Sequence, residues 1–175
     1  MRYAMVTVGL LLACGVASHA QQVTKEEVPG IRNLARLETT VACAGAITPE
    51  AVESIKKMGF VSIVNLRRAT EEGANVEQEE AAAKAAGIRY YHVPYDGSAD
   101  PKAAEAFLTA ITSPGAEPAF IHCSGGNRAA TMWLIKRIAI DRWDVTRATD
   151  EAILLGQTNA AARQFAIDYA QAHRR

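Results

Sequence analysis

The sequence predicts a single α/β domain in which a central, mainly parallel sheet is flanked by helices. Three short runs rich in β-branched, aromatic and apolar residues predict buried strands: Val61–Leu66, Arg89–Val93 and Pro118–His122. Stretches with helical start and stop signals separate these runs. Because strands that alternate with helices form parallel pairs with helices on the sheet faces, we expect three layers.

The helices between these strands have recognisable ends. The first, Pro49–Met58, follows the capping residue Thr48 and starts with proline. The second, Val76–Ala86, stops at a glycine, and the third runs from Asp100 to about Ile111. Each of them lies between two predicted strands or leads into one, as a parallel sheet requires.

A fourth predicted helix, Arg128–Ile140, is apolar over most of its circumference. We therefore expect it to be buried on most sides, with Trp133 in the core. Two further helices, near Val145–Leu155 and Ala160–Ala172, close the chain and are expected to pack around it.

Composition limits the classes of partner. The chain has 175 residues, 49% of them hydrophobic, which suits one compact domain with a core. Lys plus Arg and Asp plus Glu number 19 each. A balanced charge gives no global field for nucleic acid or an anionic membrane, so we expect no nucleic-acid partner. Any anion must be captured locally.

The N-terminus predicts export. Residues 1–20 have one positive charge at Arg2, an apolar stretch over Tyr3–Ala17, and small residues at Ser18-His19-Ala20, as in a signal peptide. The apolar stretch is too short and too interrupted to span a membrane. We therefore expect a periplasmic or secreted protein. A buried or anchoring N-terminal helix is one alternative, and a lipoprotein modified at Cys14 is another.

After residue 20 the sequence predicts two parts, a short lead-in and one domain. Residues 21–32 are polar and predict a flexible lead-in, and residues 33–173 form the expected catalytic domain. Removal of the signal would leave Cys43 and Cys123. In an oxidising compartment they could form a disulfide, or one could be buried and the other reactive. The surroundings of Cys123 favour the second interpretation.

Cys123 begins a loop that joins a buried strand to a buried helix. Such a junction directs backbone N–H groups and the positive helix end at one point. Gly125 and Gly126 allow a tight turn that exposes amides, and Arg128 can grip two oxyanion oxygens. These groups favour the thiolate of Cys123 and place it beneath a bound tetrahedral anion. Taken singly, a core cysteine, a Gly-Gly turn and a solvated arginine are ordinary features.

The stretch from His122 to Arg128 resembles the cysteine-dependent, dual-specificity-like phosphatases. It is most similar to the bacterial exported group related to the phosphatase-like domain of β-lactamase-hydrolase-like proteins. The resemblance runs from about Asn33 to Ala170 and includes Gly45–Glu50 and the strand end Asn65-Leu66-Arg67. It implies a dual-specificity-phosphatase-like fold.

The same resemblance implies a role for each residue of the loop. Cys123 would accept the phosphoryl group and Arg128 would clamp it. His122 would orient the loop and favour the thiolate, although a structural histidine is an alternative. The residues of the expected amide cradle are Ser124, Gly125, Gly126 and Asn127.

Two departures keep other functions open. Phosphatases of this superfamily place five residues between Cys and Arg, whereas this loop has four, which is compatible with the exported group but also resembles rhodanese sulfurtransferases. Ala129 follows Arg128, where many phosphatases have Ser or Thr. We therefore keep a sulfurtransferase using a Cys123 persulfide, and a non-catalytic oxyanion- or phosphopeptide-binding module, as alternatives to a phosphomonoester hydrolase.

A phosphatase also needs a general acid. Asp96 precedes a glycine in a flexible loop and is the candidate, although it could be a turn aspartate. Asp100 precedes proline and is better explained as a helix cap. Arg67 could line the pocket, but a surface ion pair with Glu71 or Glu72 is the preferred interpretation.

The rest of the sequence adds no cofactor. Glu77–Glu80 predicts a solvated helix face. The histidines show no metal-ligand spacing, so no metal and no cofactor are expected. The expected substrate is a phosphorylated small molecule or a phosphoprotein. The sequence names neither the substrate nor the oligomeric state.

Overall fold

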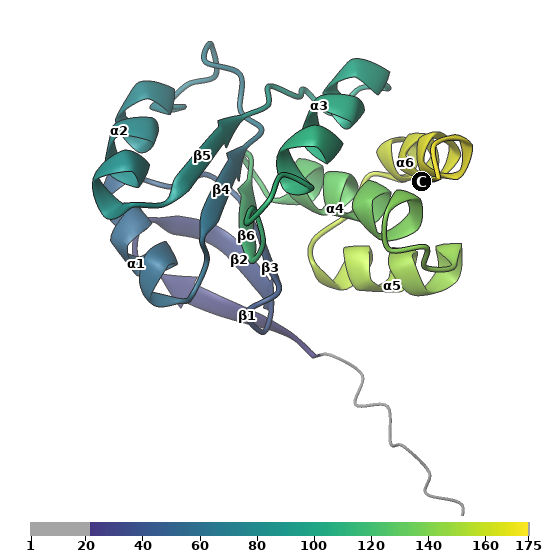
Figure 1. The fold of residues 1–175 in the computed structure, drawn as a ribbon, viewed down its shortest axis with the longest axis horizontal. Coiled ribbons are helices and arrows are strands. Elements are labelled where there is room, and N and C mark those ends of the chain that lie inside the picture. Colours follow the sequence, from purple (N-terminus) through teal and green to yellow (C-terminus); the bar gives the residue numbers. More distant parts are fainter. Residues whose placement is uncertain (1–21, 175) are drawn as a thin grey trace, which may run out of the picture.

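The computed structural model describes residues 22–174, so the predicted signal peptide and Cys14 lie outside it (Figure 1). Six strands form one sheet in the order β1-β2-β3-β6-β4-β5. The strands are β1 (Val23–Val28), β2 (Ile31–Leu37), β3 (Val41–Ala44), β4 (Ser62–Asn65), β5 (Arg89–His92) and β6 (Ala119–His122).

The parallel part of the sheet agrees with the prediction. Strands β3, β6, β4 and β5 are parallel neighbours, and the three predicted strands correspond to β4, β5 and β6. Every residue of β4 and β6 is buried, because helices cover both faces of a parallel sheet. β6 lies in the middle of the parallel part, so the loop that follows it emerges at the centre of the sheet's carboxyl edge.

The antiparallel part was not predicted, and the expected lead-in is wrong over Val23–Val28. That segment is β1, which pairs with β2 from Val23 opposite Leu37 to Val28 opposite Ile31. Its charged residues have low strand propensity, so pairing with β2 rather than local preference stabilises it. The turn uses Gly30, whose φ of 77° is favourable only for glycine.

All the predicted helices are present with small differences at their ends. They are η1 (Pro49–Ala51, a 3₁₀ turn), α1 (Val52–Lys57), α2 (Val76–Ala86), α3 (Pro101–Ile111), α4 (Asn127–Ala139), α5 (Val145–Leu154) and α6 (Ala160–Ala172). Asp100 caps α3 as predicted, since its carboxylate accepts hydrogen bonds from two N–H groups of the first turn. Thr48 precedes η1, but its side chain makes no capping hydrogen bond.

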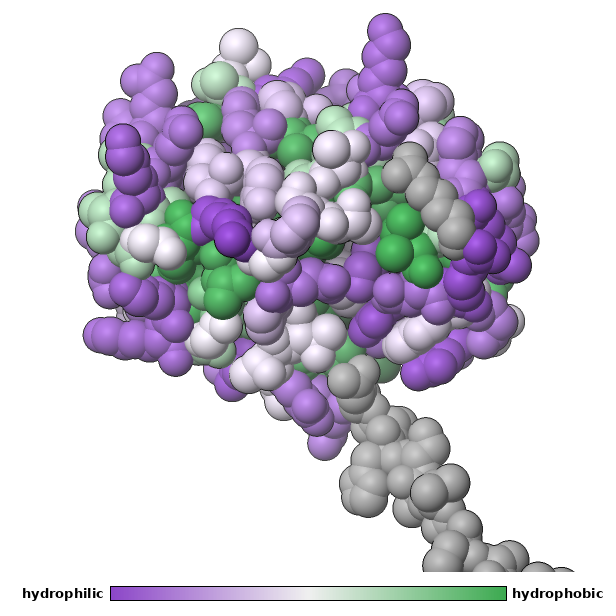
Figure 2. Space-filling model, in the orientation of Figure 1, coloured by the Kyte–Doolittle hydropathy of each residue, from purple (hydrophilic) through white to green (hydrophobic). Residues whose placement is uncertain are grey.

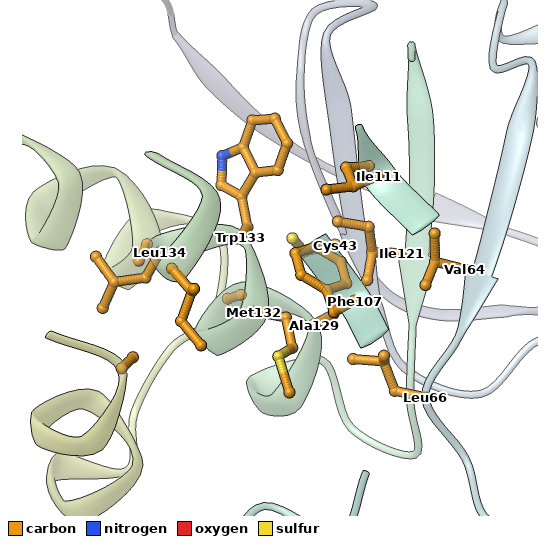
Figure 3. Close-up of a cluster of buried hydrophobic side chains, with 14 of the residues drawn as sticks. Cys43, Val64, Leu66, Phe107, Ile111, Ile121, Ala129, Met132, Trp133 and Leu134 are labelled. Carbon is orange, nitrogen blue, oxygen red and sulfur yellow. The ribbon is translucent and has the colours of Figure 1, made fainter. Parts of the chain in front are cut away.

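The helices form two layers around the sheet. α1 and α2 lie on one side, and α3 to α6 lie on the other (Figure 1). α4 is buried from Ala129 to Ala139, because it packs between the sheet and the two C-terminal helices. Figure 3 shows its residues Ala129, Met132 and Trp133 beside Phe107 of α3 and Ile121 of β6. This packing holds the start of α4 rigidly.

The outer surface is mostly polar. Figure 2 shows hydrophilic residues over most of one face, with smaller apolar areas between them. Across residues 22–174, no helix combines the length and apolar character that crossing a membrane requires.

Candidate active site

The loop from Cys123 to Gly126 joins β6 to α4 and places the thiol beneath the helix N-terminus. Cys123 is 1% exposed, and its Sγ accepts a hydrogen bond from the N–H of Gly126 at 3.1 Å. Gly126 has a φ of 104°, and a Cβ there would lie 3.7 Å from the backbone of Ala44. Glycine is therefore required at this position by its conformation, and the tight turn directs the sulfur toward the helix end.

The loop carbonyls point into the scaffold. The side chain of Asn33 on β2 donates to the carbonyl of Gly125 at 3.1 Å, and the N–H of Ala46 donates to that of Ser124 at 3.2 Å. With these carbonyls bound, the loop amides face the other way. Asn33 was not predicted as a site residue, because its contact with the loop and its left-handed φ of 50° become visible only in the structure.

Four loop amides remain available to an anion. Within residues 22–174, the following backbone N–H groups donate to no protein acceptor: those of Ser124, Gly125, Asn127 and Arg128. The first N–H groups of a helix lack intrahelical partners, and the helix dipole adds positive potential there. Ser124 and Gly125 are exposed, so these two amides of the predicted cradle are accessible, whereas Gly126 is buried and its N–H donates to the Cys123 sulfur.

Arg128 is held by the carboxylate of Glu71, which we had expected to lie at the surface as a possible partner of Arg67. Its Nη1 and Nη2 donate to the two carboxylate oxygens of Glu71 at 2.7 and 2.8 Å. The Nη1 group also donates to the carbonyl of Tyr95. This two-point contact fixes the plane of the guanidinium, which is the geometry that arginine forms with carboxylates.

The opposite edge of the guanidinium faces the loop. Nη2 donates to the hydroxyl of Ser124 at 3.0 Å, and a hydrogen bond with the Cys123 side chain contributes to the raised pKa of Arg128. Glu71 thus occupies one side of Arg128 and leaves a second pair of N–H donors near Cys123. Two oxygens of a tetrahedral anion fit such an edge.

The negative charge of Glu71 and the positive charge of Arg128 stabilise one another. The hydrogen bond from Arg128, followed by smaller contributions from Arg68 and Arg67, outweighs burial and lowers the pKa of Glu71 to about 2. Burial opposes the charge of Arg128, but Glu71 and the nearby Cys123 sulfur raise its pKa overall. Glu71 is therefore ionised and Arg128 charged at any physiological pH.

Arg67 is buried instead of forming the expected surface ion pair. It does contact Glu71, with Nε 3.5 Å from Oε2, but its other nitrogens donate to the carbonyls of Glu72 and Gly73. These contacts brace the loop after β4 that carries Glu71. Through Glu71, Arg67 therefore supports the carboxylate that binds Arg128.

The candidate acid lies at the rim of the same pocket. Asp96 is exposed and lines a pocket of about 580 Å³ together with Ser124, Asn127 and Arg128. Its carboxylate accepts a hydrogen bond from the N–H of Ser98 at 2.9 Å, and contacts with Ser98 lower its pKa. In this conformation Asp96 is ionised, so it would have to leave Ser98 before it could donate a proton.

His122 lies behind the loop and not in the path of a substrate. Both His122 and Glu79 of α2 are 0% exposed, and the imidazole Nε2 lies 3.2 Å from the Glu79 carboxylate. The imidazole is therefore enclosed behind the loop, and the expected role of His122 in orienting the loop stays a prediction. The prediction of a solvated face for Glu77–Glu80 is wrong at Glu79, because α2 packs against the sheet through this residue.

Asn127 connects the loop to the C-terminal helices. Its side-chain oxygen, oriented toward the turn before α6, accepts from the N–H groups of Thr158 and Asn159 at 2.9 Å each. The residue thus contributes its backbone amide to the cradle, while its side chain fixes the wall of the pocket. Thr131 donates to the carbonyl of Asn127 at 2.9 Å, so its hydroxyl is turned toward the helix backbone.

Both described cysteines are free thiols. Burial, followed by the nearby Cys123, raises the pKa of Cys43, which is an inert member of the core in Figure 3. The two thiols are therefore not joined in a disulfide, both are buried, and the expected reactivity of Cys123 stays a prediction. Among residues 22–174, no group of three or more His, Cys, Asp or Glu side chains could hold a metal ion.

The fold is that of the cysteine-dependent, dual-specificity-like phosphatases. Residues 33–140 match the family described as the phosphatase-like domain of beta-lactamase hydrolase-like proteins, and the chain belongs to this family. A Beta-lactamase hydrolase-like protein from Agrobacterium fabrum is 35% identical over 105 residues, which cover 57% of this chain and 24% of that relative. The chain thus matches only about a quarter of the relative's length.

Solved structures share the fold at low identity. TpbA from P. aeruginosa is 19% identical with a TM-score of 0.62, and the match covers 88% of this chain and 91% of TpbA. The core catalytic domain of the PP-IP phosphatase SIW14 from S. cerevisiae is 20% identical with a TM-score of 0.63, covering 82% and 88% of the two chains. One TpbA structure contains a cysteine-to-serine variant in complex with phosphotyrosine.

Proposed function

We propose that the protein is a cysteine-dependent phosphatase that hydrolyses a phosphomonoester through a phosphoenzyme on Cys123. The observation that carries this proposal is the convergence of unpaired loop amides and one edge of Arg128 around the Cys123 sulfur. Backbone N–H groups at a helix N-terminus and a guanidinium edge are the donors that bind a tetrahedral oxyanion. Membership of a phosphatase-like family supports the same chemistry.

The geometry supports a two-step reaction. The Cys123 thiolate attacks phosphorus, an S–P bond forms, and the bond from phosphorus to the ester oxygen breaks with its electron pair on that oxygen. Water then attacks phosphorus, the S–P bond breaks, and the thiolate and inorganic phosphate are released. Arg128 and the amides of Ser124 and Gly125 hold the equatorial oxygens in both steps, where preorganised donors have the largest effect.

Asp96 is our proposed acid for the first step. It lies at the pocket rim with Arg128, and a leaving oxygen bound there would have to replace Ser98 as its partner. The same carboxylate would accept a proton from water in the second step, as microscopic reversibility requires. Ala129 follows the arginine, so no hydroxyl at that position assists the departing thiolate.

The substrate is a phosphomonoester on a phosphoprotein or a small molecule. We also propose that residues 1–20 direct export and that the mature protein begins near Gln21 in the periplasm or outside the cell. N-terminal sequencing of the native protein tests this: an intact Met1 would contradict it, and lipid on Cys14 would select the lipoprotein alternative.

A sulfurtransferase is the second candidate. The observation that favours it is the four-residue spacing between Cys123 and Arg128, which makes a tighter loop than the superfamily's usual five. In that reaction the Cys123 thiolate would attack the outer sulfur of thiosulfate, the S–S bond of thiosulfate would break with release of sulfite, and the Cys123 persulfide would pass its outer sulfur to an acceptor such as cyanide, which regenerates the thiolate. An anion-binding module without turnover is a third.

One experiment separates the candidates. The full chain is assayed for hydrolysis of an aryl phosphate and for sulfur transfer from thiosulfate to cyanide, with Cys123→Ser as the matched control. We expect aryl phosphate turnover that Cys123→Ser reduces by at least about a thousandfold. Sulfur transfer alone would replace the phosphatase by the second candidate, and saturable phosphate binding without either activity would select the third.

A further inference from the structure

Arg68 is an exposed arginine at the candidate site to which neither the fold nor the proposed reaction gives a role. It follows Arg67 in the loop after β4, and it lines the same pocket as Arg128, Ser124 and Asp96. Its side chain is 55% exposed, whereas those of Arg67 and Arg128 are 5% and 12% exposed. Of these three arginines, Arg68 is therefore the one that a ligand in the pocket reaches most freely.

The side chain of Arg68 is held only weakly, because the carboxylate beside it is already bound. Oε1 of Glu71 accepts from Arg128 Nη1 at 2.7 Å and from the backbone N–H of Arg68 at 3.0 Å, and Oε2 accepts from Arg128 Nη2 at 2.8 Å. The Arg68 guanidinium contacts Glu71 with Nε 3.7 Å from Oε1, which is too long for a hydrogen bond. An exposed ion pair of this kind contributes little stability, so Arg68 can turn to another anion at small cost.

Positive charge exceeds negative charge around Glu71. The guanidinium groups of Arg67, Arg68 and Arg128 all contact its single carboxylate. Arg128 faces the catalytic loop, and the guanidinium of Arg67 is bound to backbone carbonyls of the loop that carries Glu71. Because arginine stays charged at every physiological pH, Arg68 adds a positive charge that Glu71 does not neutralise.

Asp96 is the other carboxylate of this pocket, and it relates Arg68 to the leaving group. Contacts with Ser98 are the main cause of the lowered pKa of Asp96, and the charge of Arg68 adds to the effect. Asp96 accepts its hydrogen bond from Ser98, so Arg68 acts on it only through space. If Asp96 protonates the leaving oxygen as proposed, the group attached to that oxygen lies near Asp96 and therefore near Arg68.

We propose that Arg68 is a specificity-determining residue, which binds a second anionic group on a ligand whose phosphoryl group is held by Arg128 and the loop amides. The pocket of about 580 Å³ lies in the range of about 300–1,000 Å³ that accommodates a whole small ligand, so it has room for more than one phosphoryl group. A second phosphate of a small molecule and the carboxylate of an acidic residue beside a phosphorylated residue share this chemistry, since a guanidinium binds either through two hydrogen bonds. The consequence for turnover rests on the proposed phosphatase function, whereas the binding of the second anion does not.

The first test measures binding and needs no turnover. The full chain carrying Cys123→Ser is titrated with inorganic phosphate and with methylenebisphosphonate, which has two phosphoryl groups on one carbon, and calorimetry gives the two dissociation constants. In this background Arg68→Gln should weaken the binding of methylenebisphosphonate by about tenfold, the effect of losing hydrogen bonds between charged groups, and that of phosphate by less than about twofold. An equal loss for both anions would overturn the proposal, because Arg68 would then bind the first phosphoryl group itself.

The second test compares two phosphotyrosine peptides, in which the phosphotyrosine is flanked on both sides by Asp or on both sides by Asn. With the native chain, KM for the Asp peptide should be lower by about tenfold while kcat is equal, because the second anion contributes binding in both the ground state and the transition state. Arg68→Gln should abolish this difference. A fall in kcat of equal size on both peptides would show that Arg68 instead positions Glu71 or Asp96, and it would overturn the proposal.

The two tests together identify the source of the second anion. An effect of Arg68→Gln on methylenebisphosphonate alone would assign a second phosphate on a small molecule, and an effect on the Asp peptide alone would assign an acidic phosphoprotein. No effect in either test would overturn the proposal. If the native chain hydrolyses no phosphomonoester but Arg68 still favours methylenebisphosphonate, the proposed phosphatase function fails and the second anion site stands.

Arg36→Gln is the matched control. Arg36 is also a partly exposed arginine that pairs with one glutamate, since its Nε lies 2.7 Å from Glu26, but it belongs to β2 and does not line the pocket of Arg68. Its loss lowers the net charge by the same amount and should leave both dissociation constants and both KM values at their native levels. A change in Arg36→Gln equal to that in Arg68→Gln would show that overall charge is the cause, and it would overturn the proposal.

Discussion

An arginine near each end of α4 pairs with a glutamate, but the two arginines differ in the donors that they leave free. At the N-terminal end, Arg128 contacts Glu71 with one edge and keeps the Nε edge toward the catalytic loop. Toward the C-terminal end, Arg137 donates through Nε and Nη2 to Glu151 and through Nη1 to Asp141. One guanidinium retains donors for a ligand, whereas the other has no free edge.

The surroundings explain the difference. Arg137 lies between the rings of Trp133 and Trp143, at 4.5 and 4.1 Å from their centroids, and the Trp133 indole shares Glu151. Aromatic faces and a shared carboxylate enclose the cation completely. Arg128 instead lines a pocket together with Ser124 and Asp96. Identical residue pairs thus stabilise the fold at one end of the helix and prepare a binding site at the other.

The largest effect is expected for Arg137, near the C-terminal end of α4, where the ion pair stabilises the fold. Arg137→Ala leaves Glu151 buried without its cation, which should lower the free energy of unfolding by about 3–5 kcal/mol. Urea unfolding followed by tryptophan fluorescence measures this loss. Turnover per folded molecule should stay near the native value, because Arg137 does not touch the pocket. An unchanged unfolding midpoint would contradict the comparison.

The next largest effect is expected for Arg128, at the N-terminal end of α4 beside the catalytic loop. Arg128→Lys keeps a positive charge but loses the planar edge that holds two phosphoryl oxygens. We expect the rate of aryl phosphate hydrolysis to fall by about 10²–10³, the effect of removing a preorganised transition-state donor. The unfolding midpoint should change less than in Arg137→Ala. Equal loss of stability with full activity would reverse the roles of the two ends.

Asp96→Asn tests whether Asp96 is the general acid of the pocket that Arg128 lines. Alkyl phosphates need protonation of the leaving oxygen, so their hydrolysis should slow by about 10². Activated aryl phosphates need little protonation and should lose less than about threefold in rate. The ratio of the two rate constants is the measurement. A uniform loss on both substrates would remove Asp96 as the acid.

The smallest effect concerns the carboxylate that holds Arg128. Because Arg128 lowers the pKa of Glu71 from 4.5 to about 2, the folded state binds fewer protons than the unfolded state between these values. The stabilisation from Glu71 is therefore complete above pH 4.5 and is lost as the pH falls toward 2. Urea midpoints at pH 6 and pH 3 should differ less in Glu71→Gln than in the native protein.

A matched control and an activity measurement accompany that variant. Glu72→Gln changes the neighbouring exposed carboxylate and should keep the native dependence on pH. Glu71→Gln should also lower turnover by about tenfold, because a neutral amide orients the guanidinium less firmly. If Glu72→Gln altered the pH dependence as much, the carboxylate bound to Arg128 would not be its source.

The sequence predicted those parts of the fold that local pattern determines. The buried strand β4, the helix α2 with its glycine stop and the capped start of α3 all agree with the structure. The catalytic loop was predicted from its glycines and its place between an apolar strand and an apolar helix. These features depend on neighbours in the chain, so periodicity and capping residues are sufficient to indicate them.

Features that depend on distant partners were missed or misassigned. β1 carries a lysine and two glutamates and forms a strand only because β2 is available to pair with it. Glu71, in the loop after β4, was expected at the surface. Its carboxylate instead accepts hydrogen bonds from Arg128, which is 57 residues away in the chain. No local pattern separates these carboxylates from solvated ones.

The sequence by itself determined the class of domain and the nucleophile loop, because strand, turn and helix signals surround Cys123 and Arg128 directly. Only the tertiary structure decided that the carboxylate of Glu71 pairs with Arg128 and that the carboxylate of Glu79 lies beside His122. Glu71 and Glu79 come from different elements, and sheet pairing and helix packing bring both to the ends of β6 and α4. Electrostatic contacts depend on distance in space and on burial, and neither quantity can be read from spacing along the chain.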